Sequence, residues 1–132
     1  MKKVFFLFVL TVFTLAGCSK MCEYRFKMTN ATQEKITLMN EYSEVELPPN
    51  EERIIFIGHD LSDIEAHDVY TEDEIINHGL WNEMMFETYV NDEKLDKELW
   101  RPEYWTYKRI SKWLGEYSMT VTNKMIEKKQ ED

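Results

Sequence analysis

The chain has 132 residues and carries 25 acidic against 16 basic side chains, a net charge of −9. Such a balance repels nucleic acid and anionic lipid head groups, which argues against DNA, RNA or peripheral membrane binding. Aromatic residues make up 14% of the chain and are spread along it, so the composition indicates a folded domain.

The N-terminus has the three parts of a secretory signal peptide. Lys2 and Lys3 give a positive start, an apolar run of 12 residues covers 4–15, and Ala16 and Gly17 are the small residues before a cleavage point. Because roughly 20 apolar residues are needed to span a bilayer, a retained transmembrane helix is the weaker interpretation.

Leu15-Ala16-Gly17-Cys18 resembles the lipobox of bacterial lipoproteins. The resemblance implies that signal peptidase recognises Leu15, Ala16 and Gly17, and that Cys18 becomes the new N-terminus and is acylated on sulfur and nitrogen. Several acyl chains on one residue anchor a protein stably. The alternative is an ordinary signal peptide that happens to be followed by a cysteine.

Cleavage after Gly17 would leave 115 residues with 14 basic and 25 acidic side chains, a charge of −11 and the size of one domain. We expect a cleaved leader at 1–17, a lipidated tether at 18–22 and one domain at 23–132. Cys22 is the only other cysteine, which argues against a disulfide-stapled fold. A free thiol, an intermolecular bridge and an unpaired residue without a role remain open for Cys22, and a bridge to Cys18 becomes possible if lipidation fails.

Alternating apolar residues predict the first two strands. Tyr24, Phe26 and Met28 alternate with polar residues, and after a turn Ile36 and Leu38 repeat the pattern.

A turn at Pro48-Pro49-Asn50-Glu51 separates Val45-Glu46-Leu47 from an aliphatic strand at 53–58. Four successive apolar residues, Ile54 to Ile57, predict a strand buried on both faces and therefore the centre of the core. On this hypothesis Phe56→Ala costs about 3–5 kcal/mol.

One segment predicts a helix. Thr71 to Glu74 form a capping box and Gly79 provides a stop, which together predict a short helix over 72–78.

The rest of the chain predicts further strands. Expected are a strand with Met84, Phe86, Thr88 and Val90 on one face, a turn at Asn91-Asp92, strands at 104–110 and 117–121, and a short helix capped by Asn123 that runs to Lys129. Together these elements predict a mostly β fold, a single antiparallel β-sandwich with a short helical insertion and a short C-terminal helix.

Several of these motifs are similar to those of small lipoproteins common in Bacteroidales. They are the lipobox, the Leu-Pro-Pro-Asn-Glu turn at 47–51, the segment from Met85 that ends in Asn-Asp-Glu-Lys, and Gly-Glu-Tyr-Ser-Met-Thr-Val-Thr-Asn-Lys-Met at 115–125. The resemblance implies a compact β-sandwich on the cell envelope with no established activity. Because no run of acids follows Cys18, it also implies an outer-membrane protein that faces the periplasm.

Candidate metal ligands occur in one acidic segment. His59, His67 and His78 lie among acids, and imidazole with carboxylate is a ligand set for zinc and similar ions. No His-Glu-x-x-His motif, nucleophile elbow or distinctive carboxylate pair accompanies them. We therefore expect neither a metal site nor another cofactor, and no enzymatic activity.

The aromatic segment is the strongest candidate for a binding surface. Its rings can stack on sugars or anchor a protein, or they can fill the core, which is the favoured interpretation. The residues are Trp100, Tyr104, Trp105, Tyr107 and Trp113. The expected function is a membrane-anchored module that binds an envelope protein or has a structural role, and the alternative is a glycan-binding accessory lipoprotein.

Overall fold

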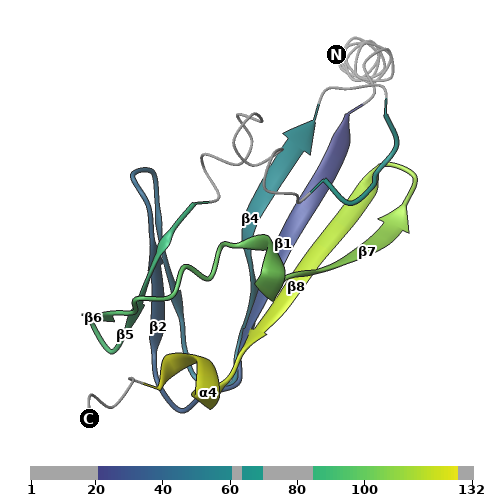
Figure 1. The fold of residues 1–132 in the computed structure, drawn as a ribbon. Coiled ribbons are helices and arrows are strands. Elements are labelled where there is room, and N and C mark those ends of the chain that lie inside the picture. The colour runs from purple at the N-terminus through teal and green to yellow at the C-terminus, as the bar shows by residue number, and fades with distance from the viewer. Residues whose placement is uncertain (1–20, 61–63, 70–84, 128–132) are drawn as a thin grey trace, which may run out of the picture.

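The computed structural model describes residues 21–60, 64–69 and 85–127, which form two four-stranded sheets (Figure 1). Sheet A has the strand order β4-β1-β8-β7 and sheet B the order β3-β2-β5-β6. The strands of sheet A are β1 Cys22–Asn30, β4 Glu52–Asp60, β7 Thr106–Ser111 and β8 Leu114–Val121. Those of sheet B are β2 Ile36–Met39, β3 Glu44–Leu47, β5 Glu87–Val90 and β6 Glu93–Lys94. A 3-10 helix, η1 Pro102–Tyr104, and helix α4 Asn123–Ile126 complete the described elements.

The predicted mostly β, sandwich-like fold is confirmed, with one difference in strand direction. β1 pairs antiparallel with β4 on one side but parallel with β8 on the other. The pairs β7–β8, β2–β3, β2–β5 and β5–β6 are antiparallel as predicted. The helical insertion predicted at 72–78 lies outside the described residues.

β1 is the central strand of the core. Its residues alternate strictly between buried and half-buried, so that Tyr24, Phe26 and Met28 point between the sheets as predicted. The Phe26 ring stacks on Tyr117 of β8 with centroids 4.8 Å apart and meets Phe56 of β4 at 5.6 Å. β1 holds this place because hydrogen-bonded strands flank it on both sides.

β4 is not the centre of the core, so that prediction is wrong. It lies at the edge of sheet A, where the side chains of Ile54 and Ile57 are 47% and 46% exposed. Ile55 and Phe56 are half-buried and pack against the core from the side. The apolar run therefore has one face on the core and the other in solvent.

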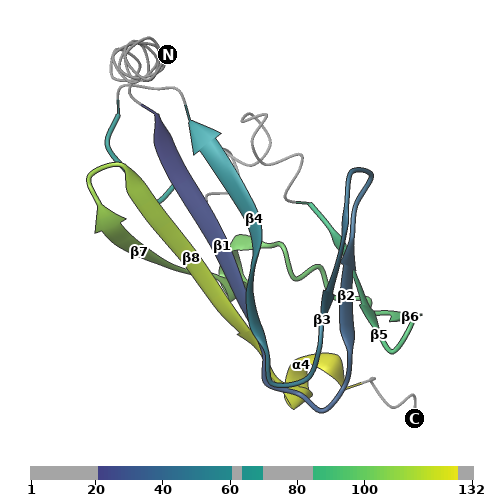
Figure 2. The same ribbon diagram turned by 180° about the vertical axis from the view of Figure 1, so that it is seen from behind.

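A buried amide joins the two sheets where they approach each other. Figures 1 and 2 show the sheets close together near α4 and further apart at their other ends. There the Asn30 side chain donates to the carbonyl oxygens of Glu34, at 2.7 Å, and Leu47, at 3.0 Å. Its oxygen accepts from the backbone N–H of Thr32 at 3.0 Å and from the Thr32 hydroxyl at 2.7 Å. All four hydrogen-bonding positions of this amide are thus used.

The turns predicted from the sequence contain three residues with positive φ angles. Asn91 and Asp92 have φ of 48° and 69°, as in the two-residue hairpin turns that favour Asn and Asp, and they connect β5 to β6. Asn50, which ends the Pro48-Pro49 turn, has φ of 61°.

Several predicted boundaries differ from the structure. The strand predicted at 117–121 begins earlier, at Leu114. Cys22, placed in the tether, is the first residue of β1 and is fully buried. The strand predicted from Tyr104 begins at Thr106, because Pro102 to Tyr104 form η1. Helix α4 follows the cap residue Thr122 and ends at Ile126, so Asn123 is the first helical residue rather than the cap.

Candidate functional site

The predicted anchor lies outside the part of the chain that the structure describes. Leu15, Ala16, Gly17 and Cys18 all precede Met21, the first described residue. Among the described residues no helix is long and apolar enough to cross a membrane.

The aromatic segment contributes mainly to the core, as its favoured interpretation predicts. Trp105 is buried, its indole N–H donates to the Leu99 carbonyl at 2.9 Å, and its ring meets Phe26 edge-on at 5.5 Å. Tyr107 packs on Tyr117 with ring centroids 5.0 Å apart. Trp105 and Tyr107 thus face the interior together, while Thr106 and Ile110 are exposed.

The remaining rings of the segment are half-buried against the same core. The Arg101 guanidinium lies 5.2 Å from the Trp100 ring centroid, and the Lys112 ammonium lies 5.8 Å from that of Trp113. Tyr104 ends η1. The five rings therefore divide between the interior and its margin, and they do not form one continuous exposed surface.

The two described histidines have different contacts: His59 contacts a carboxylate and His67 contacts a backbone carbonyl. His59 Nε2 lies 3.3 Å from Glu23 Oε1, and the Arg25 side chain lies 2.6 Å from the other oxygen of Glu23. This hydrogen bond from Arg25 is the main reason that the pKa of Glu23 is lowered. His67 Nδ1 lies 2.9 Å from the Glu65 carbonyl oxygen.

Within the described ranges no group of three or more His, Cys, Asp or Glu side chains is placed to hold a metal ion. His78 and Asp63 lie outside these ranges. The expectation that the chain binds no metal stays a prediction.

Two tyrosines hold the segment 64–69 against sheet A. The Tyr117 hydroxyl accepts from the Val69 N–H at 2.7 Å and donates to Asp68 at 3.0 Å. The Tyr24 hydroxyl accepts from the His67 N–H at 3.4 Å. Burial raises the pKa of both phenols far above their ordinary value, so the hydroxyls stay protonated.

Cys22 lies beside this cluster and is a free, buried cysteine. Burial raises the pKa of its thiol, which keeps it in the unreactive protonated form. A buried thiol cannot reach a second molecule without local unfolding, so the intermolecular bridge is the least compatible of the open alternatives.

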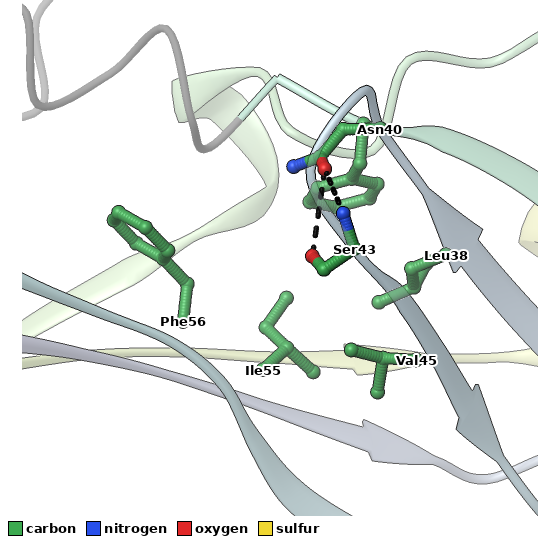
Figure 3. Close-up of a pocket in the computed structure, with 7 residues that line it drawn as sticks. Leu38, Asn40, Ser43, Val45, Ile55 and Phe56 are labelled. Atoms are coloured by element: carbon green, nitrogen blue, oxygen red, sulfur yellow. Dashed lines mark hydrogen bonds between the residues drawn. The ribbon is translucent and has the colours of Figure 1, made fainter.

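Between β4 and the β2–β3 hairpin lies a cavity of about 30 Å³ (Figure 3). Leu38, Val45, Ile55 and Phe56 line it, and Asn40 accepts hydrogen bonds from the Ser43 N–H at 2.8 Å and its hydroxyl at 3.4 Å. The volume has room for about one or two water molecules, and an organic ligand does not fit.

The exposed face of β4 is a candidate surface that the apolar run of this strand did not predict. Ile57 lies opposite Arg25 of β1 and Ile54 opposite Lys27, so the two isoleucines share the outer face of sheet A with these cations. The Lys27 ammonium lies 3.4 Å from Glu52 and 3.2 Å from Glu116. Charged residues stand at both ends of the apolar run, and this pattern is typical of edge strands in natural proteins. It could have indicated that β4 lies at the edge of its sheet.

No protein-family model, no curated protein and no solved structure matches this chain.

Proposed function

We propose that the chain is a lipoprotein of the bacterial cell envelope, anchored through lipid on Cys18 and acting as a non-enzymatic protein-binding or structural module. The positive start, the short apolar run and the lipobox-like Leu15-Ala16-Gly17-Cys18 support the anchor. Only three residues separate Cys18 from Cys22, the first residue of β1. The domain therefore sits close to the membrane, on the periplasmic side of the outer membrane.

The exposed edge strand is the observation that carries the protein-binding role. β4 presents Ile54 and Ile57 on the outer face, each nearly half exposed, with cations on the neighbouring strand. Isolated exposed aliphatic residues are ordinary, but two on an edge strand add an apolar strip to an edge that can also pair with another strand.

The anchor is tested by Cys18→Ala in intact cells. We expect the variant to leave the membrane fraction or to keep its leader, as seen by fractionation and by intact mass. Normal cleavage together with membrane retention would contradict lipidation. Ser19→Ala, next to the lipidated residue, is the matched control and should be processed and retained normally.

The docking surface is tested by a photo-crosslinking amino acid placed at Ile57, compared with the same group at Ile110. Ile110 has the same 46% exposure but lies on β7, at the opposite edge of sheet A. A discrete product from position 57 that is absent from position 110 supports docking at β4. Equal products from both positions, or recovery of only the most abundant lipoproteins, would contradict it.

A glycan-binding role is the second candidate, and one observation favours it. Trp100 and Tyr42, which is 71% exposed, line the same open hollow together with Asn40, Glu41 and Glu87. Rings and carboxylates are the groups that stack on and hydrogen-bond to sugars. Soluble glycans should then change the tryptophan fluorescence of the chain but not that of Trp100→Ala, and no change across a broad glycan panel would contradict the role.

A further inference from the structure

We infer that the protein partner at β4 is a second copy of this chain, whose β4 pairs antiparallel with the first and joins the two A sheets. The inference rests on the proposed protein-binding role and adds the identity and register of the partner. One side of β4 pairs with β1, and none of the described strands pairs with its other side. An edge strand of nine residues is a template for strand addition.

The order of inward and outward residues along β4 is symmetric. Pairing with β1 places Glu52, Ile54, Ile57 and His59 on the outer face, and Arg53, Phe56 and Gly58 on the inner face. The register shift between Phe26 and Lys27 leaves Ile55 without a partner on β1, and Ile55 also points inward, into the cavity beside Phe56 (Figure 3). Read from 52 to 59, the order is the same in both directions.

This symmetry selects one register. Residues directly opposite in an antiparallel pair share a face of the sheet. A two-fold axis midway between Ile55 and Phe56 places every outward residue opposite an outward residue and every inward residue opposite an inward one. A slip of one or two positions breaks this match, because the two consecutive inward residues then meet outward ones.

The side chains brought together in this register are compatible. Ile54 lies opposite Ile57 of the second copy, so the two exposed isoleucines of each chain cover each other. Glu52 faces His59 of the second copy, a carboxylate opposite an imidazole. Arg53, which donates to the Glu46 carbonyl at 2.9 Å, faces Gly58, which has no side chain to obstruct it.

The local charge also permits self-association despite the net charge of −9. Arg25 and Lys27 lie next to Ile57 and Ile54 on the same face. They form ion pairs with Glu23, Glu52 and Glu116, so the carboxylates around the two isoleucines are largely compensated. Because β1 starts opposite Asp60, the Cys22 ends of the two chains lie at opposite ends of the joined sheet. Two chains anchored in one membrane would then lie with their strands along its surface.

The register is tested by cysteine pairs in the full chain. Ile54→Cys and Ile57→Cys variants with different tags are expressed together and oxidised mildly in membranes. Opposite residues of an antiparallel pair have Cα atoms about 4.5–5.5 Å apart, within the range of a disulfide. We expect a mixed-tag disulfide dimer from the co-expressed pair and from the pair Glu52→Cys with His59→Cys.

Each variant expressed alone is the matched control. Residue 54 of one chain and residue 54 of the other are offset by three positions, about 10 Å, which is too far for a disulfide. Lys108→Cys on β7 controls for random collision. Dimers from single variants or from Lys108→Cys at the same yield as the mixed pair would overturn the register, and so would the absence of any mixed dimer.

A second measurement uses the full chain purified in mild detergent. Ile57→Lys puts a charge into the joined face and should weaken the dimer about tenfold or more in sedimentation velocity, whereas Ile110→Lys should leave it intact. A monomeric parent chain would overturn the inference. Photo-crosslinking at position 57 that captures one other envelope protein and no second copy would overturn it too, while the proposed protein-binding function would stand.

Discussion

β1 and β4 are adjacent strands of nine residues each, yet they have opposite roles in the fold. β4 contains the longer unbroken apolar run, Ile54 to Ile57, whereas β1 alternates apolar with charged residues. β1 nevertheless supplies the centre of the core because strands flank it on both sides, whereas β4 has a neighbouring strand on one side only. Position within the sheet, and not the number of apolar residues, decides which strand is buried.

The largest expected loss of stability comes from Phe26, which we compare with its cross-strand partner Phe56. Phe26 is fully buried and meets rings of β4, β8 and Trp105, so we expect Phe26→Ala to cost about 3–5 kcal/mol. Phe56 is half-buried, and Phe56→Ala should cost about 1–2 kcal/mol, less than its sequence alone predicted. Urea unfolding followed by circular dichroism measures both, and equal losses would refute the assignment of β4 to the margin of the core.

Asn30, the last residue of β1, gives the next largest expected effect. Asn30→Ala removes four hydrogen bonds and leaves the carbonyl oxygens of Glu34 and Leu47 without this donor, which should cost about 2–3 kcal/mol. Asn40 is the matched control, because its amide oxygen also accepts bonds from the backbone, but in an exposed turn. Asn40→Ala should cost under about 1 kcal/mol, because water can replace those bonds. A similar loss for both variants in the same unfolding assay would show that the Asn30 network does not connect the sheets.

A substitution in β8, the other strand that pairs with β1, should reduce stability less. An added Cβ at Gly115 of β8 would lie 2.8 Å from the Tyr107 ring and 2.9 Å from the Tyr24 ring. Gly115→Ala should therefore cost about 1–3 kcal/mol through overpacking. Ser118→Ala, on the outer face of the same strand, should change the stability by less than about 0.5 kcal/mol. Gly115→Ala at parental stability would indicate that the two rings move aside freely.

The features that sequence predicted are the local ones. The alternation of Tyr24, Phe26 and Met28 identified β1 and its inward face, and Asn91-Asp92 identified the β5–β6 turn, because each pattern reports the conformation of its own few residues. The favoured interpretation of the aromatic segment, that its rings fill the core, agrees with the buried Trp105 and with the packing of Tyr107 on Tyr117.

Features that depend on strand order could not be predicted in this way. The parallel pairing of β1 with β8 and the edge position of β4 are set by segments far apart in the sequence. For the same reason Ile54 and Ile57 appeared to be core residues, and the surface they form was missed. Cys22 was assigned to the tether because nothing in its own neighbours reveals that Asp60 of β4 pairs with it.

The smallest expected effect is a pH dependence that separates the buried tyrosines of sheet A from an exposed one. Burial raises the pKa of Tyr24 and Tyr117 in the folded chain. In the unfolded chain a tyrosine has its ordinary pKa of about 10. Above that pH the unfolded state has lost protons that the folded state keeps, so the contribution of these phenols to stability is constant below about pH 10 and falls as the pH rises further. Each such tyrosine contributes a slope of up to about 1.4 kcal/mol per pH unit.

Tyr117→Phe should remove one such slope from urea unfolding measured between about pH 9 and 11, whereas Tyr42→Phe, at a site 71% exposed, should leave the slope as it is. Tyr117→Phe also loses the hydrogen bonds to Val69 and Asp68, so it lowers stability at every pH, and the change in slope is the measurement that reports burial of the phenol. An unchanged slope in Tyr117→Phe would mean that the phenol ionises as readily in the folded chain as in the unfolded one, and that the end of the core near the segment 64–69 is open to water.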